Sequence, residues 1–136
     1  MLSLTAHPLW RRWFGTRSEK AASRFLSSLG YRLVEHNFTC DIGEIDIVAL
    51  DGTTLVFVEV RSTESSDGQI AAQSVDAKKQ HRLTRLALYY MQNRRLLDCA
   101  ARFDVLAISW PAGQAAPAIT HYPNAFETTG RFQMYS

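Results

Sequence analysis

Two short segments of alternating apolar and polar residues, separated by a turn, constrain the fold of this chain more than any other feature. Residues 43–50 and 55–61 are each typical of a β-strand, and an Asp-Gly-Thr-Thr sequence at 51–54 favours a β-hairpin between them. A register slip of one residue would bury the charged face or expose the apolar one, so the alternation resists slippage. The predicted apolar face consists of Ile45, Ile47, Ala49, Val56, Val58 and Val60.

The other segments predict an α+β domain around this hairpin. A capping-box spacing of Thr16 and Glu19, followed by Gly30, favours a helix over 17–29. We further expect a strand over 31–38, a helix over 75–94 and a strand over 102–108, with room for one short edge strand around Ile119. The main elements follow the order αβββαβ, which is typical of an α+β domain with a mixed sheet.

Length and composition indicate one soluble domain. The chain has 136 residues, 46% of them apolar, and no apolar run of membrane-spanning length or secretory leader pattern. The two cysteines, Cys40 and Cys99, lack metal-site spacing and suit reduced thiols in the cytoplasm. We expect an irregular basic and aromatic arm over 1–15 and a single domain over 16–136.

Charge is unevenly distributed along the sequence. Residues 1–40 hold six Lys or Arg and two acids, residues 41–70 hold one Arg and seven acids, and residues 71–136 hold eight Lys or Arg and four acids. An acidic centre between basic flanks suits an enzyme that binds a cation on carboxylates and a polyanion around them, although a short chain can show such a pattern by chance.

The polar face of the hairpin concentrates carboxylates. If Leu50 pairs with Leu55, Asp46 lies opposite Glu59, whereas a two-residue turn would change the partners and keep the faces. Cβ atoms of directly opposed residues are ~5 Å apart, so two carboxylates there repel unless a cation lies between them. Mg²⁺ accepts such a pair together with water and phosphate oxygens. The alternative is a solvated face on which Glu44 pairs with Arg61, but Asp is disfavoured within strands.

The second predicted helix presents a basic stripe formed by Lys78, Arg82 and Arg85. It is expected either to contact phosphates, with help from Arg11 and Arg12, or to be a solvated helix face.

Several short motifs together carry a family resemblance. They are Gly43-Glu44-Ile45-Asp46, Phe57-Val58-Glu59-Val60-Arg61, Lys79-Gln80, Arg102-Phe103-Asp104-Val105 and Asn124-Ala125-Phe126. In order and spacing, over roughly residues 17–127, the sequence resembles the YraN family of small bacterial proteins. That family resembles the PD-(D/E)xK nucleases, the restriction-endonuclease-like superfamily that includes archaeal Holliday junction resolvases. The resemblance implies a mixed sheet flanked by helices (α/β/α) and hydrolysis of DNA with Mg²⁺ or Mn²⁺.

The resemblance also implies residue roles. Asp46, Glu59 and Arg61 match catalytic positions, and Glu19 matches a glutamate that completes the metal site of Asp46 and Glu59. Arg61 stands where the superfamily has lysine, and arginine stays protonated. Lys79 either reaches the same site or extends along its helix to solvent, and we favour the second interpretation.

These observations leave two classes of function open. The first is a metal-dependent endonuclease acting on structured or branched DNA, with Lys78, Lys79, Arg82 and Arg85 as its nucleic-acid-binding residues. The second is a non-catalytic nucleic-acid-binding or interaction module that keeps the nuclease fold. We interpret Asp104 as the acid of a structural ion pair, and we leave homodimer formation open.

Overall fold

The computed structural model describes residues 17–63, 76–113 and 115–126. The predicted arm over 1–15, the capping residue Thr16 and most of the polar segment 62–73 lie outside these ranges. No helix within them is long and apolar enough to cross a membrane.

The described elements form a mixed sheet with two helices. They are α2 (Arg17–Ser28), β1 (Arg32–Cys40), β2 (Gly43–Asp51), β3 (Thr54–Thr63), α4 (Ala77–Asn93), β4 (Ala101–Ser109) and β5 (Ala118–Tyr122). The strands lie in the order β1-β2-β3-β4-β5, and β3 pairs with β4 in parallel while the other neighbours are antiparallel. Helix α4 belongs to the long connection that a parallel pair requires. The predicted α+β class and the edge strand around Ile119 are confirmed.

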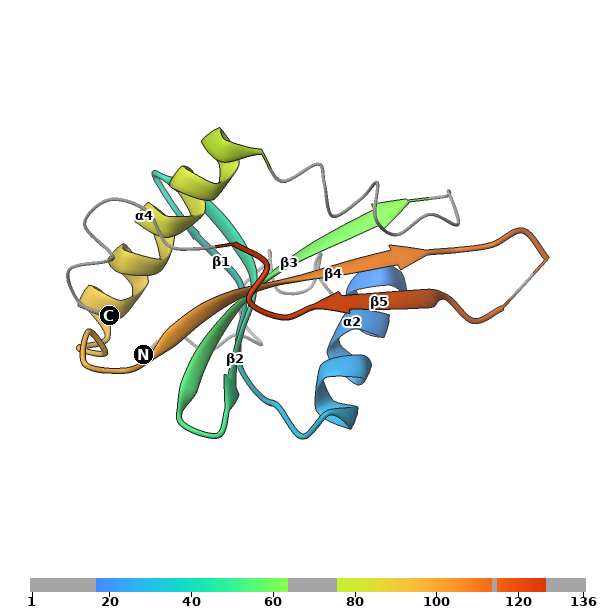
Figure 1. Ribbon diagram of the computed structural model, residues 1–136, viewed down its shortest axis with the longest axis horizontal. Coiled ribbons are helices and arrows are strands. Elements are labelled where there is room, and N and C mark those ends of the chain that lie inside the picture. Colours follow the sequence, from blue (N-terminus) through green and yellow to red (C-terminus); the bar gives the residue numbers. More distant parts are fainter. Residues whose placement is uncertain (1–16, 64–75, 114, 127–136) are drawn as a thin grey trace.

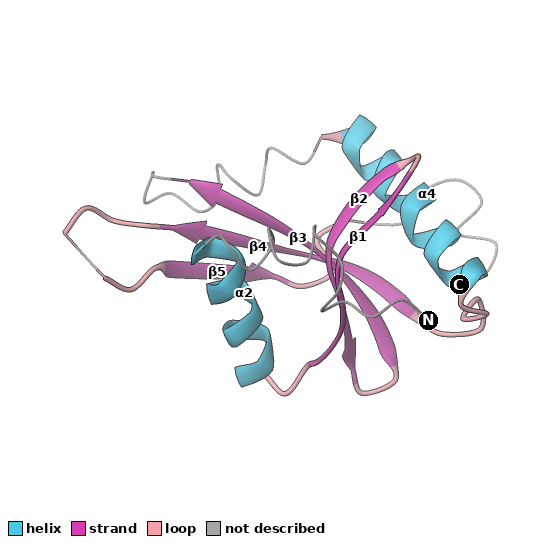
Figure 2. Ribbon diagram, turned by 180° about the vertical axis from the view of Figure 1, so that it is seen from behind, coloured by secondary structure: helices cyan, strands magenta, loops and turns pink. Residues whose placement is uncertain are grey.

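The two helices cover opposite faces of the sheet (Figures 1 and 2). Helix α2 packs Ala22 and Leu26 onto one face, and α4 packs its apolar side onto the other. The α2 layer contains Ile47, Ala49, Val56, Val58, Leu106 and Ile108. The α4 layer contains Phe38, Ile45, Val48, Leu55, Phe57, Leu83, Leu86, Ala87, Tyr90, Met91, Phe103 and Val105. The sheet is therefore sandwiched between helices, as the α/β/α prediction requires.

The hairpin register is the predicted one near the turn, but β2 and β3 then separate. Their pairing runs from Asp51 with Thr54 to Ile47 with Val58 and ends there. Beyond this point β2 continues with β1, while β3 continues with β4 as far as Thr63. The diverging ribbons are visible in Figure 1. The prediction that Asp46 lies directly opposite Glu59 in the ladder is wrong, because the strands part just before these two residues.

One apolar residue of the hairpin faces the opposite layer from the predicted one. Ile45 packs beneath α4 with Phe38, whereas Ile47 packs beneath α2. The β1–β2 pairing passes from His36–Ile47 to Phe38–Ile45, and Asn37 between them has a left-handed φ of 55°. Because Ile45 and Ile47 are two residues apart on β2 and face opposite layers, the strict two-residue alternation that the sequence pattern assumed is broken at Asp46. Val60 is half-buried rather than part of the core.

Helix α4 is capped at its start and packs its middle turns close to the beginning of β2. The Asp76 carboxylate caps the helix by accepting a hydrogen bond from the Lys79 backbone N–H (2.9 Å). At Gly43, where φ is +154°, an added Cβ would lie 3.4 Å from Leu86 Cδ1 and 3.6 Å from Arg82 Cδ. These are ordinary van der Waals distances, so the backbone conformation, rather than lack of space, favours glycine at this position.

Candidate active site

Asp46 lies at the point where β2 and β3 separate. Its Oδ2 accepts a hydrogen bond from the Val60 N–H at 2.8 Å. The side chain of Asp46 thus satisfies a β3 backbone donor beyond the end of the β2–β3 ladder. This contact explains why a residue that is disfavoured in strand interiors is accommodated in β2.

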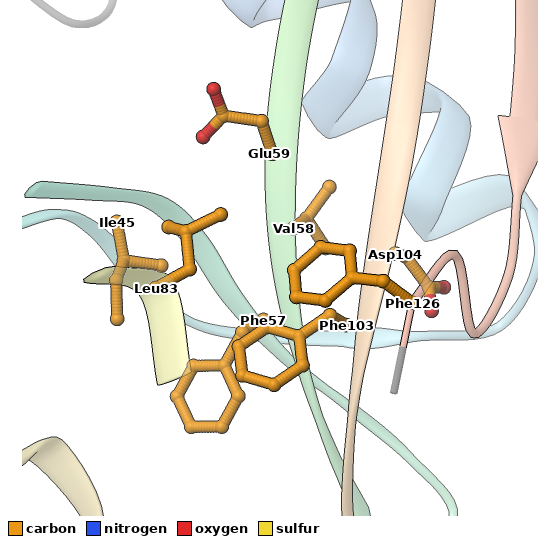
Figure 3. Close-up of a pocket in the computed structure, with 8 residues that line it drawn as sticks. All are labelled: Ile45, Phe57, Val58, Glu59, Leu83, Phe103, Asp104 and Phe126. Carbon is orange, nitrogen blue, oxygen red and sulfur yellow. The ribbon is translucent and has the colours of Figure 1, made fainter. Parts of the chain in front are cut away.

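Glu59 approaches the same region from β3. Its side chain is only 8% exposed, and its Oε2 lies 3.1 Å from Lys79 Nζ and 3.4 Å from Arg61 Nε. Figure 3 shows Glu59 at the rim of a small pocket lined mainly by apolar side chains, with its carboxylate directed away from the rings of Phe103 and Phe126. The carboxylate is therefore largely removed from water and held between two cations.

The two carboxylates interact electrostatically. Burial raises the pKa of Asp46 from 3.8 to about 7, and repulsion from Glu59 is the next largest contribution. The Val60 N–H opposes this shift, while Glu44 and Glu19 raise the pKa of Asp46 further. Asp46, Glu59, Glu44 and Glu19 therefore form one acidic neighbourhood, drawn from α2, β2 and β3.

This neighbourhood suits a hard divalent cation held by two carboxylates. A cation would relieve the repulsion that raises the pKa of Asp46, and Mg²⁺ commonly uses one or two carboxylates and completes its shell with water and phosphate. Within residues 17–63, 76–113 and 115–126, no three His, Cys, Asp or Glu side chains are grouped closely enough to hold a metal. Glu19 contributes to the field at Asp46, and its role as a third ligand stays a prediction.

Lys79 reaches the site, so the favoured interpretation of a lysine extending to solvent is wrong. Its ammonium contacts Glu59 at 3.1 Å although the two residues belong to different layers of the fold. The first turn of α4, which Asp76 caps, therefore lies beside β3. Spacing within the helix indicated only that Lys79 lies towards the inner side of α4. Its contact with Glu59 depends on how α4 packs on the sheet.

The basic stripe of α4 is exposed, as predicted. Lys78, Arg82 and Arg85 all lie at the surface, and the stem of Arg82 lies near Gly43 at the start of β2. Because Lys79 on the same helix contacts Glu59, the stripe begins next to the acidic neighbourhood. Contact of the stripe with phosphates stays a prediction.

Asp104 forms the predicted ion pair. It is fully buried, and its oxygens accept hydrogen bonds from Arg102 Nε (3.0 Å) and the Asn124 N–H (3.0 Å) and lie 2.7 Å from His121 Nε2. Arg102 also donates to the hydroxyl of Tyr31. Sequence reasoning missed His121 and Tyr31 because nothing in their local pattern indicates a partner far along the chain. The motif Asn124-Ala125-Phe126 now has a structural explanation, since Phe126 stacks on Phe103 with a centroid distance of 4.7 Å.

The raised pKa of Asp46 predicts that Asp46→Asn stabilises the protein at neutral and alkaline pH. The folded state keeps the Asp46 proton up to about pH 7, whereas the unfolded chain releases it near pH 3.8. Wild-type stability therefore falls as pH rises through this window, and an amide, which does not ionise, avoids the loss. At pH 8 we expect Asp46→Asn to raise the free energy of unfolding by on the order of 2–4 kcal/mol.

Urea denaturation at pH 4, 6 and 8 measures this effect, and the gain should disappear towards pH 4. Asp41→Asn, at an exposed position before β2, is the matched control and should change stability little at any pH. An equal gain at all three pH values would contradict the assigned cause, because it would not come from ionisation of Asp46.

Comparisons with known proteins agree with the sequence resemblance. Residues 18–108 match a family model described as "Uncharacterised protein family UPF0102". A UPF0102 protein of Geobacter sulfurreducens is 42% identical over 113 residues, which cover 83% of this chain and 88% of the relative. UPF0102 proteins of Geobacter metallireducens (42% over 119 residues, 88% and 96%) and Moorella thermoacetica (46% over 98 residues, 72% and 82%) are similar. The family match spans all the candidate residues, from Glu19 to Arg85.

Proposed function

This chain belongs to the uncharacterised protein family UPF0102, the YraN family that its motifs resemble, and we propose that it is a divalent-metal-dependent endonuclease of the PD-(D/E)xK type. One observation carries the proposal. Asp46 and Glu59 lie near each other where β2 and β3 separate, and burial, together with repulsion from Glu59, raises the pKa of Asp46 to about 7. Perturbed carboxylates beside lysine and arginine are typical of sites that bind cations and polyanions.

The proposed roles follow from the contacts. Asp46 and Glu59 hold Mg²⁺ or Mn²⁺, with Glu19 contributing negative charge nearby. When bound, the metal polarises a phosphodiester and lowers the pKa of a water molecule. Arg61, whose Nε lies 3.4 Å from Glu59 Oε2, binds the phosphate and stabilises charge that develops on it. The Val60 N–H fixes the orientation of Asp46 through its 2.8 Å hydrogen bond.

The proposed substrate is DNA, and its structured or branched form is inferred from the resemblance to junction resolvases. The exposed cations of α4 lie on the helix that reaches the acidic neighbourhood, so a phosphate backbone bound along α4 would pass close to Asp46 and Glu59. Base-specific recognition is not part of the proposal.

Incubating purified protein with labelled duplex, flap and four-way junction DNA in Mg²⁺ or Mn²⁺ tests the function directly. We expect metal-dependent cleavage of at least one branched substrate, which EDTA abolishes. If neither metal supports cleavage of any of the three, while the protein still binds them, the protein is a non-catalytic nucleic-acid-binding module and the proposal fails.

The basic stripe gives a separate prediction about binding. Arg82→Glu combined with Arg85→Glu should weaken DNA binding roughly ten- to hundredfold and flatten its salt dependence by about two units of slope, because each lost phosphate contact contributes about one unit. A gel-shift titration over several salt concentrations measures both quantities.

The matched control reverses two exposed cations of α2, in the Lys20→Glu and Arg24→Glu double variant. It introduces the same charge change on the opposite face of the sheet. Equal weakening by both double variants would show that only net charge matters and that the stripe is not a specific interface.

A further inference from the structure

The β3 strand lacks the lysine of the PD-(D/E)xK motif, because Arg61 occupies that position. A guanidinium binds phosphate oxygens with a planar fork, whereas an ammonium is a compact donor that turns freely toward a single water or oxygen atom. Arg61 therefore suits the phosphate-binding part of the lysine's role better than the orientation of a water molecule. On β3, no residue is then well suited to orient the attacking water molecule.

A lysine from another element lies at the same carboxylate. Lys79 Nζ is 3.1 Å from Glu59 Oε2, which is closer than Arg61 Nε at 3.4 Å. Its side chain is 30% exposed, so the ammonium lies at the boundary between the acidic neighbourhood and solvent. The backbone of Lys79 is itself fixed, since its N–H donates to the Asp76 cap at 2.9 Å.

We infer that Lys79 of α4 supplies the catalytic ammonium that β3 lacks, so that the lysine function and the phosphate clamp are divided between Lys79 and Arg61. This inference rests on the proposed nuclease function. Lys79 donates hydrogen bonds to the attacking water and to a non-bridging oxygen of the scissile phosphate. Glu59 holds the ammonium in place before substrate binds.

The reaction is a hydrolysis, and the site supplies orientation and charge stabilisation. The oxygen of water forms a bond to phosphorus and its proton passes to solvent, while one ester P–O bond breaks. The leaving oxygen keeps the electron pair of that bond and takes a proton from solvent water. Negative charge grows on the non-bridging oxygens, where the Lys79 and Arg61 cations stabilise it.

A merely structural role for Lys79 predicts a different result. In that case the ammonium only neutralises the buried Glu59 carboxylate of the metal-free protein, and a bound metal would replace it. Cleavage by a Lys79→Met variant would then recover at saturating metal. If the Lys79 ammonium is catalytic, saturating metal cannot replace it, and the Lys79→Met variant would still cleave slowly.

The experiment compares Lys79→Met with Lys20→Met, which removes an exposed lysine from α2 on the opposite face of the sheet. Single-turnover cleavage at saturating Mn²⁺ should fall at least about a hundredfold in Lys79→Met and less than about threefold in Lys20→Met. Mn²⁺ affinity, measured by calorimetry without DNA, should be unchanged or a few-fold tighter in Lys79→Met, because a competing cation has been removed from Glu59.

Exchange of the two cations provides an independent test that preserves charge. The Lys79→Arg variant alone should cleave poorly although it keeps a cation beside Glu59. If Lys79→Met does not fold, Lys79→Arg takes its place in the cleavage comparison. Adding Arg61→Lys to Lys79→Arg should recover at least about tenfold of the lost rate, because an ammonium again lies next to Glu59.

Three outcomes would overturn the inference. They are near wild-type cleavage by Lys79→Met at saturating Mn²⁺, a more than tenfold loss of its Mn²⁺ affinity, and no recovery in the double variant. If the proposed nuclease function is wrong, the wild-type protein itself would cleave none of the substrates. This result is distinct from the three outcomes above, and the inference would then fail as well.

Discussion

Asp46→Asn and Glu59→Gln are each expected to lower the cleavage rate by at least about a thousandfold while leaving DNA binding intact or stronger. A metal ion supplies several kcal/mol of transition-state stabilisation, and every 1.4 kcal/mol corresponds to about a factor of ten in rate. Removing either carboxylate also removes repulsion of the phosphate backbone, which favours binding. Single-turnover cleavage and gel-shift affinity for the same junction measure the two effects.

Glu44→Gln is the matched control for both variants. Glu44 lies on β2, two residues from Asp46, and it is exposed. It raises the pKa of Asp46 less than Glu59 does, so its removal should change cleavage only a few-fold. Residual cleavage by Asp46→Asn within tenfold of the wild type would show that Asp46 is not a metal ligand, even if the protein is a nuclease.

Asp104→Ala is expected to destabilise the fold by about 3–5 kcal/mol, because it leaves buried partners of a carboxylate without their acceptor. The carboxylate is fully buried, and it contacts Arg102 of the same strand, His121 on β5 and the backbone of Asn124. Its removal should therefore loosen the C-terminal strand as well as lower the free energy of unfolding. Urea denaturation measures the free energy of unfolding of the whole domain, and hydrogen exchange at residues 118–125 measures the loosening of the C-terminal strand.

Arg102 provides an internal control for this prediction, since it pairs with two acids of different exposure. Its NH1 lies 3.0 Å from Asp51 Oδ2, and the Asp51 side chain is 47% exposed. Exposed ion pairs contribute little, so Asp51→Ala should cost less than about 1 kcal/mol. Similar losses for Asp51→Ala and Asp104→Ala would mean that burial does not decide the strength of these contacts.

The two acids at the centre of the fold illustrate opposite uses of burial. Asp104 is surrounded by hydrogen-bond donors and a cation, which together satisfy a buried carboxylate. Among the residues that the structure describes, Asp46 accepts only the Val60 N–H, and its burial together with three neighbouring acids raises its pKa and disfavours its ionised form. A position that destabilises the protein in its ionised form is common where a site is built to bind a cation.

The alternating residues of the hairpin were sufficient to predict its strands, its turn and most of its core, because side chains of a strand point to alternate faces and a one-residue slip would bury charge. Val56 and Val58 face the predicted layer for this reason, and the observed pairing of Leu50 with Leu55 is the predicted one. The same local pattern identified Asp46 and Glu59 as candidate residues, and the family resemblance is confirmed over residues 18–108.

What only the tertiary structure decided is how the chain departs from that regular pattern. Ile45 faces the α4 layer although Ile47 faces the α2 layer, so the alternation of β2 is broken between them, which no apolar–polar pattern encodes. The separation of β2 from β3 depends on each strand having a different outer partner, β1 or β4, which is a property of the whole sheet. Lys79 contacts Glu59 because α4 packs over the start of β2, and the partner of a side chain across layers follows from that packing rather than from spacing within a helix. Local periodicity thus determined the elements and the candidate acids, whereas contacts between distant segments determined the geometry of the site.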